Sequence, residues 1–172
     1  MSKAFFRFYG ELNFFLDKEQ KETTFSHSFF GSPGIKDTIE ALGVPHPEVK
    51  LIIVNGEVKD FEYNLIDGDR ASIYPKFRKL TLPDSLKPET VEINQYKFLI
   101  DNHLDKLARF LRMMGFDTVQ DKSLNGQSLI EKAVDEDRIL LTGSPTLLKN
   151  SKIKKGYCIK HDIPRHQLKE VI

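Results

Sequence analysis

The chain has 172 residues, enough for one domain or for two small ones. Its 26 Lys and Arg residues nearly balance 25 Asp and Glu residues, so the net charge of +1 excludes a uniformly basic nucleic-acid-binding protein, and any basic surface must be local. The single cysteine, Cys158, excludes an intramolecular disulfide and a cysteine-rich zinc site. Because there is neither an apolar leader nor an apolar run of about 18 residues, we expect a cytoplasmic protein with no membrane partner.

The first 78 residues carry strand patterns, turn signals and one short helical pattern. Aromatic-rich and apolar runs predict strands, and apolar residues at helical spacing predict a helix between them. In chain order these are strands over 4–9 and 23–30, a helix over 35–42, and strands over 51–54 and 71–74. Asn55-Gly56 is a strong hairpin signal. The order β-β-α-β-β predicts an α+β domain of the β-grasp, or ubiquitin-like, kind over residues 1–78.

The pattern changes in the second half. Residues 79–93 contain Pro83 and Pro88 and show no periodicity, which predicts a linker. Residues 94–172 then alternate between strands and helices. The strands are expected over 96–100, 116–119, 139–142 and 157–159, and the helices over 103–114, 128–135, 145–149 and 164–172. Repeated strand–helix units predict an α/β domain with a parallel sheet.

Acidic residues follow the first two predicted strands of this domain, at the sheet edge where α/β folds bind ligands. The first strand ends at Asp101, and we place Asp117 and Asp121 after the second. Carboxylates gathered there could hold Mg²⁺ or Mn²⁺, which would activate a water that hydrolyses a phosphodiester. The candidate catalytic residues are Asp101, Asp117 and Asp121, with Asp101 and Asp121 as the metal ligands. The alternative is that Asp101 caps the next helix, as Ser144 would cap a later one.

Basic residues recur at a spacing of three in the first helix of this domain. Lys106, Arg109 and Arg112 lie opposite its apolar stripe, and they predict contacts to RNA phosphates. His103, at the start of the helix, is a further candidate for phosphate contact. A solvated helix face is the alternative interpretation of the same spacing.

Several of these stretches resemble the Mut-seven C-terminal RNase domain family, a member of the PIN-like nuclease group, and the ubiquitin-like domain that accompanies it. The most specific are Lys106-Leu-Ala-Arg-Phe-Leu-Arg112 and Val44-Pro-His46. Others cover 98–104, 115–118, 138–142 and 167–171 in the second half, and 7–13, 39–43, 54–56, 68–69 and 74–75 in the first. The resemblance implies a Mg²⁺-dependent RNase architecture of the PIN-like kind over 94–172, fused to a β-grasp module, with RNA as partner.

The chain departs from that family at the acidic positions. Where the resemblance implies Thr-Arg-Asp after the third strand, the chain has Thr142-Gly143-Ser144, and Ser123 and Asn125 replace acidic residues after the second. A hydroxyl in place of a carboxylate removes a full charge from a metal site, so we expect weak binding of Mg²⁺ or Mn²⁺ and impaired hydrolysis. No zinc and no zinc ribbon are expected, because paired cysteines are missing.

Two other function classes stay open. One is a nuclease fold that binds RNA or a ribonucleoprotein without cutting it. The other is an adaptor that docks a protein partner on the β-grasp domain, by its sheet face or by strand addition at an edge. A sulfur-carrier role is excluded, because such carriers need a free Gly-Gly terminus and this half runs on through Lys76-Phe-Arg-Lys79.

Overall fold

The computed structural model describes residues 1–75 and 96–172. It divides the chain into two compact units, Met1–Arg78 and Lys79–Ile172, and each is described by itself. The predicted linker over 79–93 lies outside the described residues. Within the described ranges, no helix combines the length and the apolarity that crossing a membrane requires.

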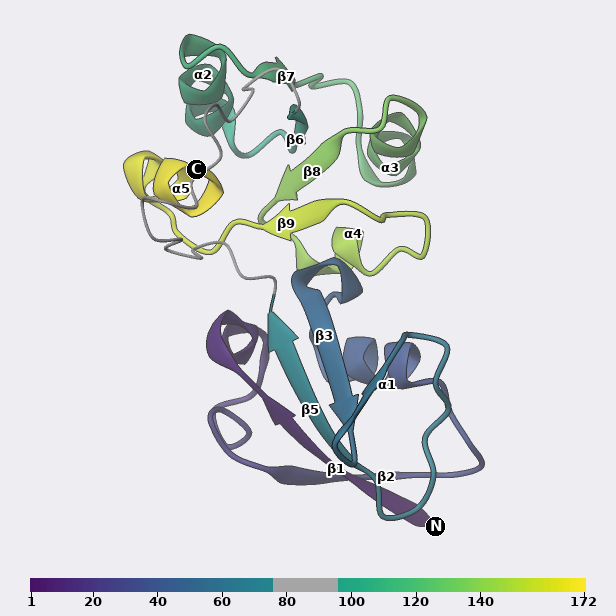
Figure 1. Cartoon of the computed structure of the whole chain (residues 1–172). Coiled ribbons are helices and arrows are strands. Elements are labelled where there is room, and N and C mark those ends of the chain that lie inside the picture. The colour runs from purple at the N-terminus through teal and green to yellow at the C-terminus, as the bar shows by residue number, and fades with distance from the viewer. Residues whose placement is uncertain (76–95) are drawn as a thin grey trace, which may run out of the picture. The chain divides into compact units, whose positions relative to one another are not determined.

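The first unit is a five-stranded mixed sheet with one α-helix packed on it (Figure 1). Its elements are β1 (Ser2–Phe8), η1 (Gly10–Phe15), β2 (Phe25–Phe29), α1 (Ile35–Ala41), η2 (His46–Glu48), β3 (Val49–Val54), β4 (Glu57–Lys59) and β5 (Arg70–Pro75). The strand order is β2-β1-β5-β3-β4, with β1 and β5 parallel and the other neighbours antiparallel. Two hairpins flanking a central parallel pair, with a helix crossing between them, form the predicted ubiquitin-like β-grasp fold.

Strand alternation determines which face of this sheet is buried. Ala4, Phe6 and Phe8 of β1 are at most 1% exposed and pack with Ile35 and Ile39 of α1. Side chains one position out of phase therefore project from the opposite face, away from α1. In Figure 1, α1 lies behind the strands, so that opposite face is turned toward the viewer.

The hairpin between β3 and β4 has the turn that Asn55-Gly56 predicts. Both residues have positive φ, 52° and 86°, as the two-residue turn that matches strand twist requires. β4 itself was not among the predicted strands, because three residues with an exposed Val58 give too little alternation to recognise. The helices η1 and η2 were also not predicted.

The second unit is a four-stranded, all-parallel sheet with helices on both faces. Its elements are β6 (Lys97–Ile100), α2 (Asp105–Met113), β7 (Asp117–Val119), α3 (Gly126–Asp135), β8 (Ile139–Thr142), α4 (Pro145–Leu148), β9 (Gly156–Cys158) and α5 (Pro164–Val171). The strand order is β7-β6-β8-β9. The predicted α/β domain with a parallel sheet is confirmed.

Each face of the parallel sheet has its own helices, with α2 and α5 on one side and α3 and α4 on the other (Figure 1). Leu104, Leu107 and Leu111 pack on Phe98 and Ile100, so these residues of β6 face α2 and α5. Alternation then turns Leu99 and Asp101 toward the α3 and α4 side. This phase fixes the side of the sheet on which each candidate residue lies.

Candidate functional site

Asp101 lies at the carboxyl end of β6, where the sequence placed it, and a hydroxyl of the neighbouring strand holds its side chain. The Asp101 N–H donates to Leu141 O at 3.0 Å, and Thr142 Oγ1 donates to Asp101 Oδ2 at 2.7 Å. Ser144 N in turn donates to Thr142 Oγ1 at 3.0 Å. Thr142 is fully buried, so one hydroxyl joins Asp101 to the backbone of Ser144.

The alternative that Asp101 caps the following helix is wrong. Helix α2 begins at Asp105, and its N-cap residue is Leu104, without a side-chain cap hydrogen bond. The carboxylate of Asp101 accepts from Thr142 instead. Ser144 does occupy the N-cap position of α4, ahead of Pro145, but its side chain makes no cap hydrogen bond either. Neither side chain is therefore committed to a helix end.

The loop that carries Asp121 is tied to the Asp101 segment. Gln120 Nε2 donates to Asp101 O at 3.2 Å, and Asn102 Nδ2 donates to Leu124 O at 2.9 Å. The carboxylate of Asp121, however, accepts from the N–H and the hydroxyl of Ser123, which lower the pKa of this carboxyl. The structure thus brings the two segments together, and it gives each carboxylate its own hydroxyl partner.

Asp117 does not lie at the carboxyl edge, and the expectation that it follows its strand and assists Asp101 is corrected. It begins β7 and lies opposite Lys97, the first residue of β6. Lys97 and Asp101 are four positions apart in the chain, which is about 13 Å along a strand. Asp117 Oδ1 accepts from Arg138 at 2.7 Å, and this contact lowers the pKa of the Asp117 carboxyl. Asp117 is part of an ion pair at the opposite edge.

These donors do not fit a protein-built site for Mg²⁺ or Mn²⁺. Such ions prefer oxygen ligands with several negative charges, and the described residues contain no group of three Asp, Glu, His or Cys side chains that could hold a metal. At the Asp101 position the donors are one carboxylate and hydroxyls. The amide oxygen of Asn102, next in the chain, is buried without a hydrogen-bond partner and adds no charge.

The basic residues of α2 divide into two kinds. Lys106 and Arg109 are exposed, as is His103 ahead of the helix. Arg112 is exposed as well, but its Nε donates to Thr118 O of β7 at 2.9 Å. All three side chains therefore present charge at the surface of the helix, and Arg112 in addition anchors the end of the helix to the sheet.

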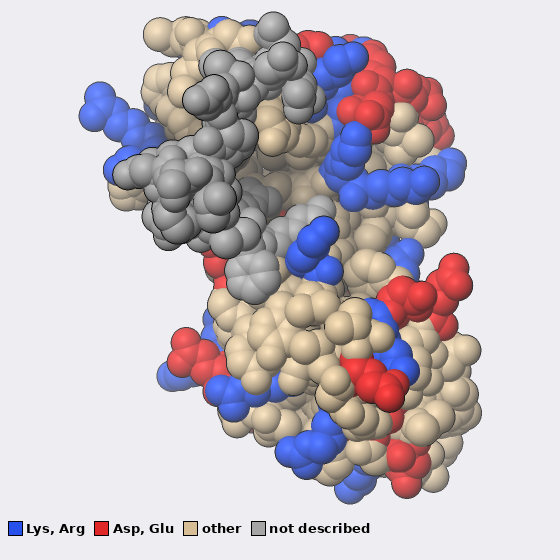
Figure 2. Space-filling view, in the orientation of Figure 1, with Lys and Arg blue, Asp and Glu red and all other residues tan. Residues whose placement is uncertain are grey.

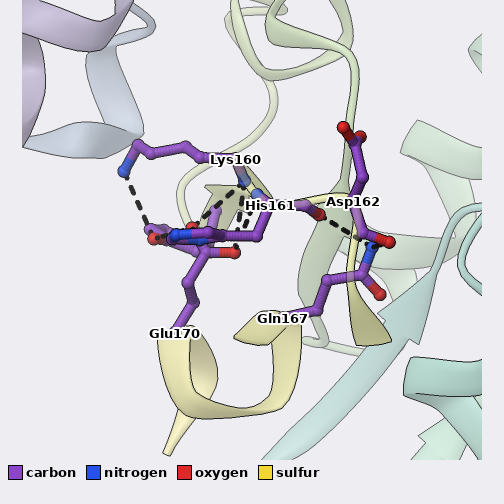
Figure 3. Close-up of polar contacts among 6 residues, drawn as sticks. Lys160, His161, Asp162, Gln167 and Glu170 are labelled. Atoms are coloured by element: carbon purple, nitrogen blue, oxygen red, sulfur yellow. Dashed lines mark hydrogen bonds and ion pairs between the residues drawn. The ribbon is translucent and has the colours of Figure 1, made fainter. Parts of the chain in front are cut away.

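A polar cluster at the end of β9 was missed from the sequence (Figure 3). The side chain of Glu170, in α5, is 8% exposed and accepts from the backbone N–H groups of Lys160, at 3.2 Å, and His161, at 3.4 Å. Its Oε1 also lies 3.0 Å from His161 Nδ1 and accepts from Tyr157 OH at 3.3 Å. Lys160 Nζ donates to Tyr157 OH at 3.2 Å. We refer to Tyr157, Lys160, His161 and Glu170 as the β9 cluster.

The β9 cluster shares the carboxyl edge with Asp101 but lies on the other face of the sheet. Ile159 N donates to Thr142 O at 2.8 Å, which places Lys160 and His161 just beyond the end of β8. Tyr157 packs with the residues under α2 and α5, whereas Asp101 and Thr142 are in the opposite phase. His161 looks like a surface residue in the sequence, and its pairing with Glu170 nine residues later has no local signal.

Charged side chains on the face shown in Figure 2 are scattered in small groups of both signs over each unit. This agrees with the near balance of charges in the sequence.

Comparison with protein-family models gives two matches. Residues 1–81 match the model described as Mut7-C ubiquitin, and residues 96–172 match the one described as Mut7-C RNAse domain. Together they cover the chain except for residues 82–95. Neither the comparison with curated proteins nor the comparison with solved structures gave a match.

Proposed function

The chain belongs to the Mut7-C ribonuclease family, carrying a ubiquitin-like domain ahead of its RNAse domain, and from this premise we propose that it binds RNA and hydrolyses it slowly or not at all. The proposal of slow or absent hydrolysis rests on the contacts of Asp101. Its carboxylate accepts from Thr142 Oγ1, and the described residues around it supply no set of carboxylates for a metal.

RNA binding is supported by the charge and exposure of α2. Lys106 and Arg109 are exposed on the side of the helix turned away from the sheet, and their guanidinium and ammonium groups suit phosphate oxygens. Lys160 and His161 add basic groups at the same edge as the start of α2. A few cations of this kind are sufficient for salt-dependent binding, which a net charge of +1 does not prevent.

The test of binding compares two double variants of the full chain with labelled single-stranded RNA, by fluorescence anisotropy over a salt series. Lys106→Gln with Arg109→Gln should weaken binding and reduce the slope of log K against log salt by about 1.4, since each phosphate contact on a single strand contributes about 0.7. Lys152→Gln with Lys154→Gln, which removes two exposed charges before β9 at the opposite edge, is the matched control. Equal effects of both pairs would reject α2 as the surface.

The test of hydrolysis uses the same RNA with Mn²⁺ and compares wild type, Asp101→Asn and Ser144→Asp. We expect little cleavage by wild type and no further loss in Asp101→Asn. Ser144→Asp places a second carboxylate next to the hydroxyl that binds Asp101, so we expect it to raise Mn²⁺ affinity in a calorimetric titration. Rapid Mn²⁺-dependent cleavage by wild type that Asp101→Asn abolishes would contradict the proposed impairment.

A further inference from the structure

We propose that the face of the ubiquitin-like sheet opposite α1 is a second RNA-binding surface, specific for single-stranded RNA. The proposal takes its ligand class from the proposed function but concerns a different domain and different residues. We call this surface the open sheet face and define it by Phe5, Arg7, Tyr9, Arg70 and Tyr74. It is the face opposite α1.

Register and phase bring these residues together. Phe5 and Arg7 alternate with the buried Phe6 and Phe8, so their side chains project away from the core. The parallel pairing of β1 with β5 sets Phe5 opposite Arg70. Tyr9, just beyond β1, donates its N–H to Ile73 O at 2.9 Å and so lies beside the end of β5.

The aromatic and basic side chains stack on one another. The rings of Tyr9 and Tyr74 are parallel within 5°, with centroids 4.4 Å apart. The guanidinium of Arg7 lies 5.2 Å from the centroid of Tyr9, and that of Arg70 lies 5.6 Å from the centroid of Phe5. The result is a stack of aromatic rings and guanidinium groups that places two positive charges beside three rings on regular strands.

The charge on this face has one sign. The outward positions of β1, β2 and β5 are Lys3, Phe5, Arg7, Ser26, Ser28, Arg70, Ser72 and Tyr74, which include three cations and no carboxylate. Arg7 Nε is buried and has no hydrogen-bond partner in the described part of the chain, and its guanidinium lies over the Tyr9 ring. Figure 2 shows largely uncharged surface over β1 and β5, with separate charged groups of both signs around it.

Single-stranded RNA is the occupant that this chemistry favours. Unpaired bases stack on aromatic rings, which contributes about 1–3 kcal/mol per base, while arginines contact the backbone. Duplex RNA hides its base faces and offers a flat sheet few contacts beyond phosphate. Burial and the neighbouring Tyr9 hydroxyl raise the pKa of Tyr74, so this phenol stays neutral and adds no charge that would repel phosphate.

The experiment uses the full chain and a short oligouridylate containing 4-thiouridine, cross-linked by light and mapped by peptide mass spectrometry. We expect cross-links within 5–9 and 70–75. Arg7→Gln with Arg70→Gln should weaken binding of single-stranded RNA by about tenfold or more, from two lost cationic contacts, and should affect a duplex much less. Lys18→Gln with Lys21→Gln removes two exposed charges from the same domain and should change little.

The outcomes separate this inference from the proposed function. If the Arg7 and Arg70 variant behaves like its control and residues 5–9 and 70–75 receive no cross-links, the open sheet face does not bind RNA, and a protein-docking role is the remaining use for it. The Lys106 and Arg109 variant tests the other domain in the same assay. Equal binding of duplex and single strand by wild type would also overturn the proposal. The cross-links on wild type keep the test decisive if a variant unfolds.

Discussion

One hydroxyl connects the end of β8 to the end of β6. Thr142 is fully buried, donates to Asp101 Oδ2 and accepts from the N–H of Ser144. Buried polar groups that lose their partners cost stability, because water cannot replace the lost bond. Asp101 therefore contributes to the packing of the sheet edge through this contact, whether or not the chain cuts RNA.

Replacing this hydroxyl should destabilise the second domain. Thr142→Val conserves shape but leaves Asp101 and the N–H of Ser144 without their partner, so we expect the free energy of unfolding to fall by about 1–3 kcal/mol. Thr142→Ser, which keeps the hydroxyl, should lose less. Urea denaturation of both variants checks the order, and a Val variant as stable as wild type would show that the hydroxyl contributes nothing.

Gly43 and Gly68 in the first domain differ in how much space is available for a side chain. Gly43 has φ +110°, and a Cβ built on it would lie 2.6 Å from Phe15 O, a backbone atom. Gly68 has φ +85° with open space around the same position. Both need the left-handed region, but only Gly43 also needs the absence of a side chain.

We therefore expect Gly43→Ala to be much more destabilising than Gly68→Ala. The second change should cost about 1–2 kcal/mol, the general penalty of a left-handed non-glycine residue, and the first should cost more because Phe15 must also move. Thermal unfolding of both variants measures the difference. Similar melting temperatures would mean that the loop after α1 shifts easily.

At the scale of elements, Arg138 links three segments at the amino edge of the parallel sheet. Its guanidinium donates to Asp117 of β7 at 2.7 Å, pairs with Glu136 ahead of β8, and reaches Phe98 O of β6 at 3.4 Å. The side chain of Arg138 is 11% exposed, whereas that of Asp117 is 48% exposed. Because the carboxylate is half exposed, the pair connects β7 to the segment ahead of β8 but adds little stability.

The pKa of Asp117 gives this pair a defined pH dependence. Arg138 lowers the pKa of the Asp117 carboxyl from its ordinary value of 3.8, so its stabilising contribution is complete above that value and is lost as pH falls through the lowered one. Asp117→Asn should lower the free energy of unfolding at about pH 7 by at most about 1 kcal/mol, and by less at about pH 3. Urea denaturation at both pH values measures this. Asp162→Asn, at an exposed carboxylate without an ion pair in the described residues, is the control, and a constant difference from wild type would contradict the assignment.

Strand β7, which begins at Asp117, shows what could not be predicted from the sequence. Alternating strand and helix patterns were sufficient to predict both folds, and Gly115 correctly ended the helix before β7. The edge at which Asp117 lies was not predictable, because a three-residue strand has ends that shift by as much as its own length. The contact between Glu170 and His161 was not predictable either, since it depends on how α5 packs.

At the scale of the whole molecule, the proposed RNA contacts lie on two separately folded units. Each has its own core, one under α1 and one under α2 and α5. Two weak surfaces on one chain bind a long ligand more tightly than either does alone, because the second contact forms at a high effective concentration. A chain with nearly balanced charge can then bind RNA without a continuous basic surface.

RNA length should therefore matter more for wild type than for variants with one surface removed. Lengthening a single-stranded oligonucleotide from about 6 to about 30 nucleotides should raise wild-type affinity by more than the extra binding registers alone explain. The reason is that a second contact on the same strand can raise affinity by about 10²-fold or more. Arg7→Gln with Arg70→Gln, or Lys106→Gln with Arg109→Gln, should each remove this excess, while Lys152→Gln with Lys154→Gln should keep it. Fluorescence anisotropy across a length series provides the measurement. An excess that survives in both surface variants would show that the two domains do not share one strand, because each pair removes one of the two contacts that the effect requires.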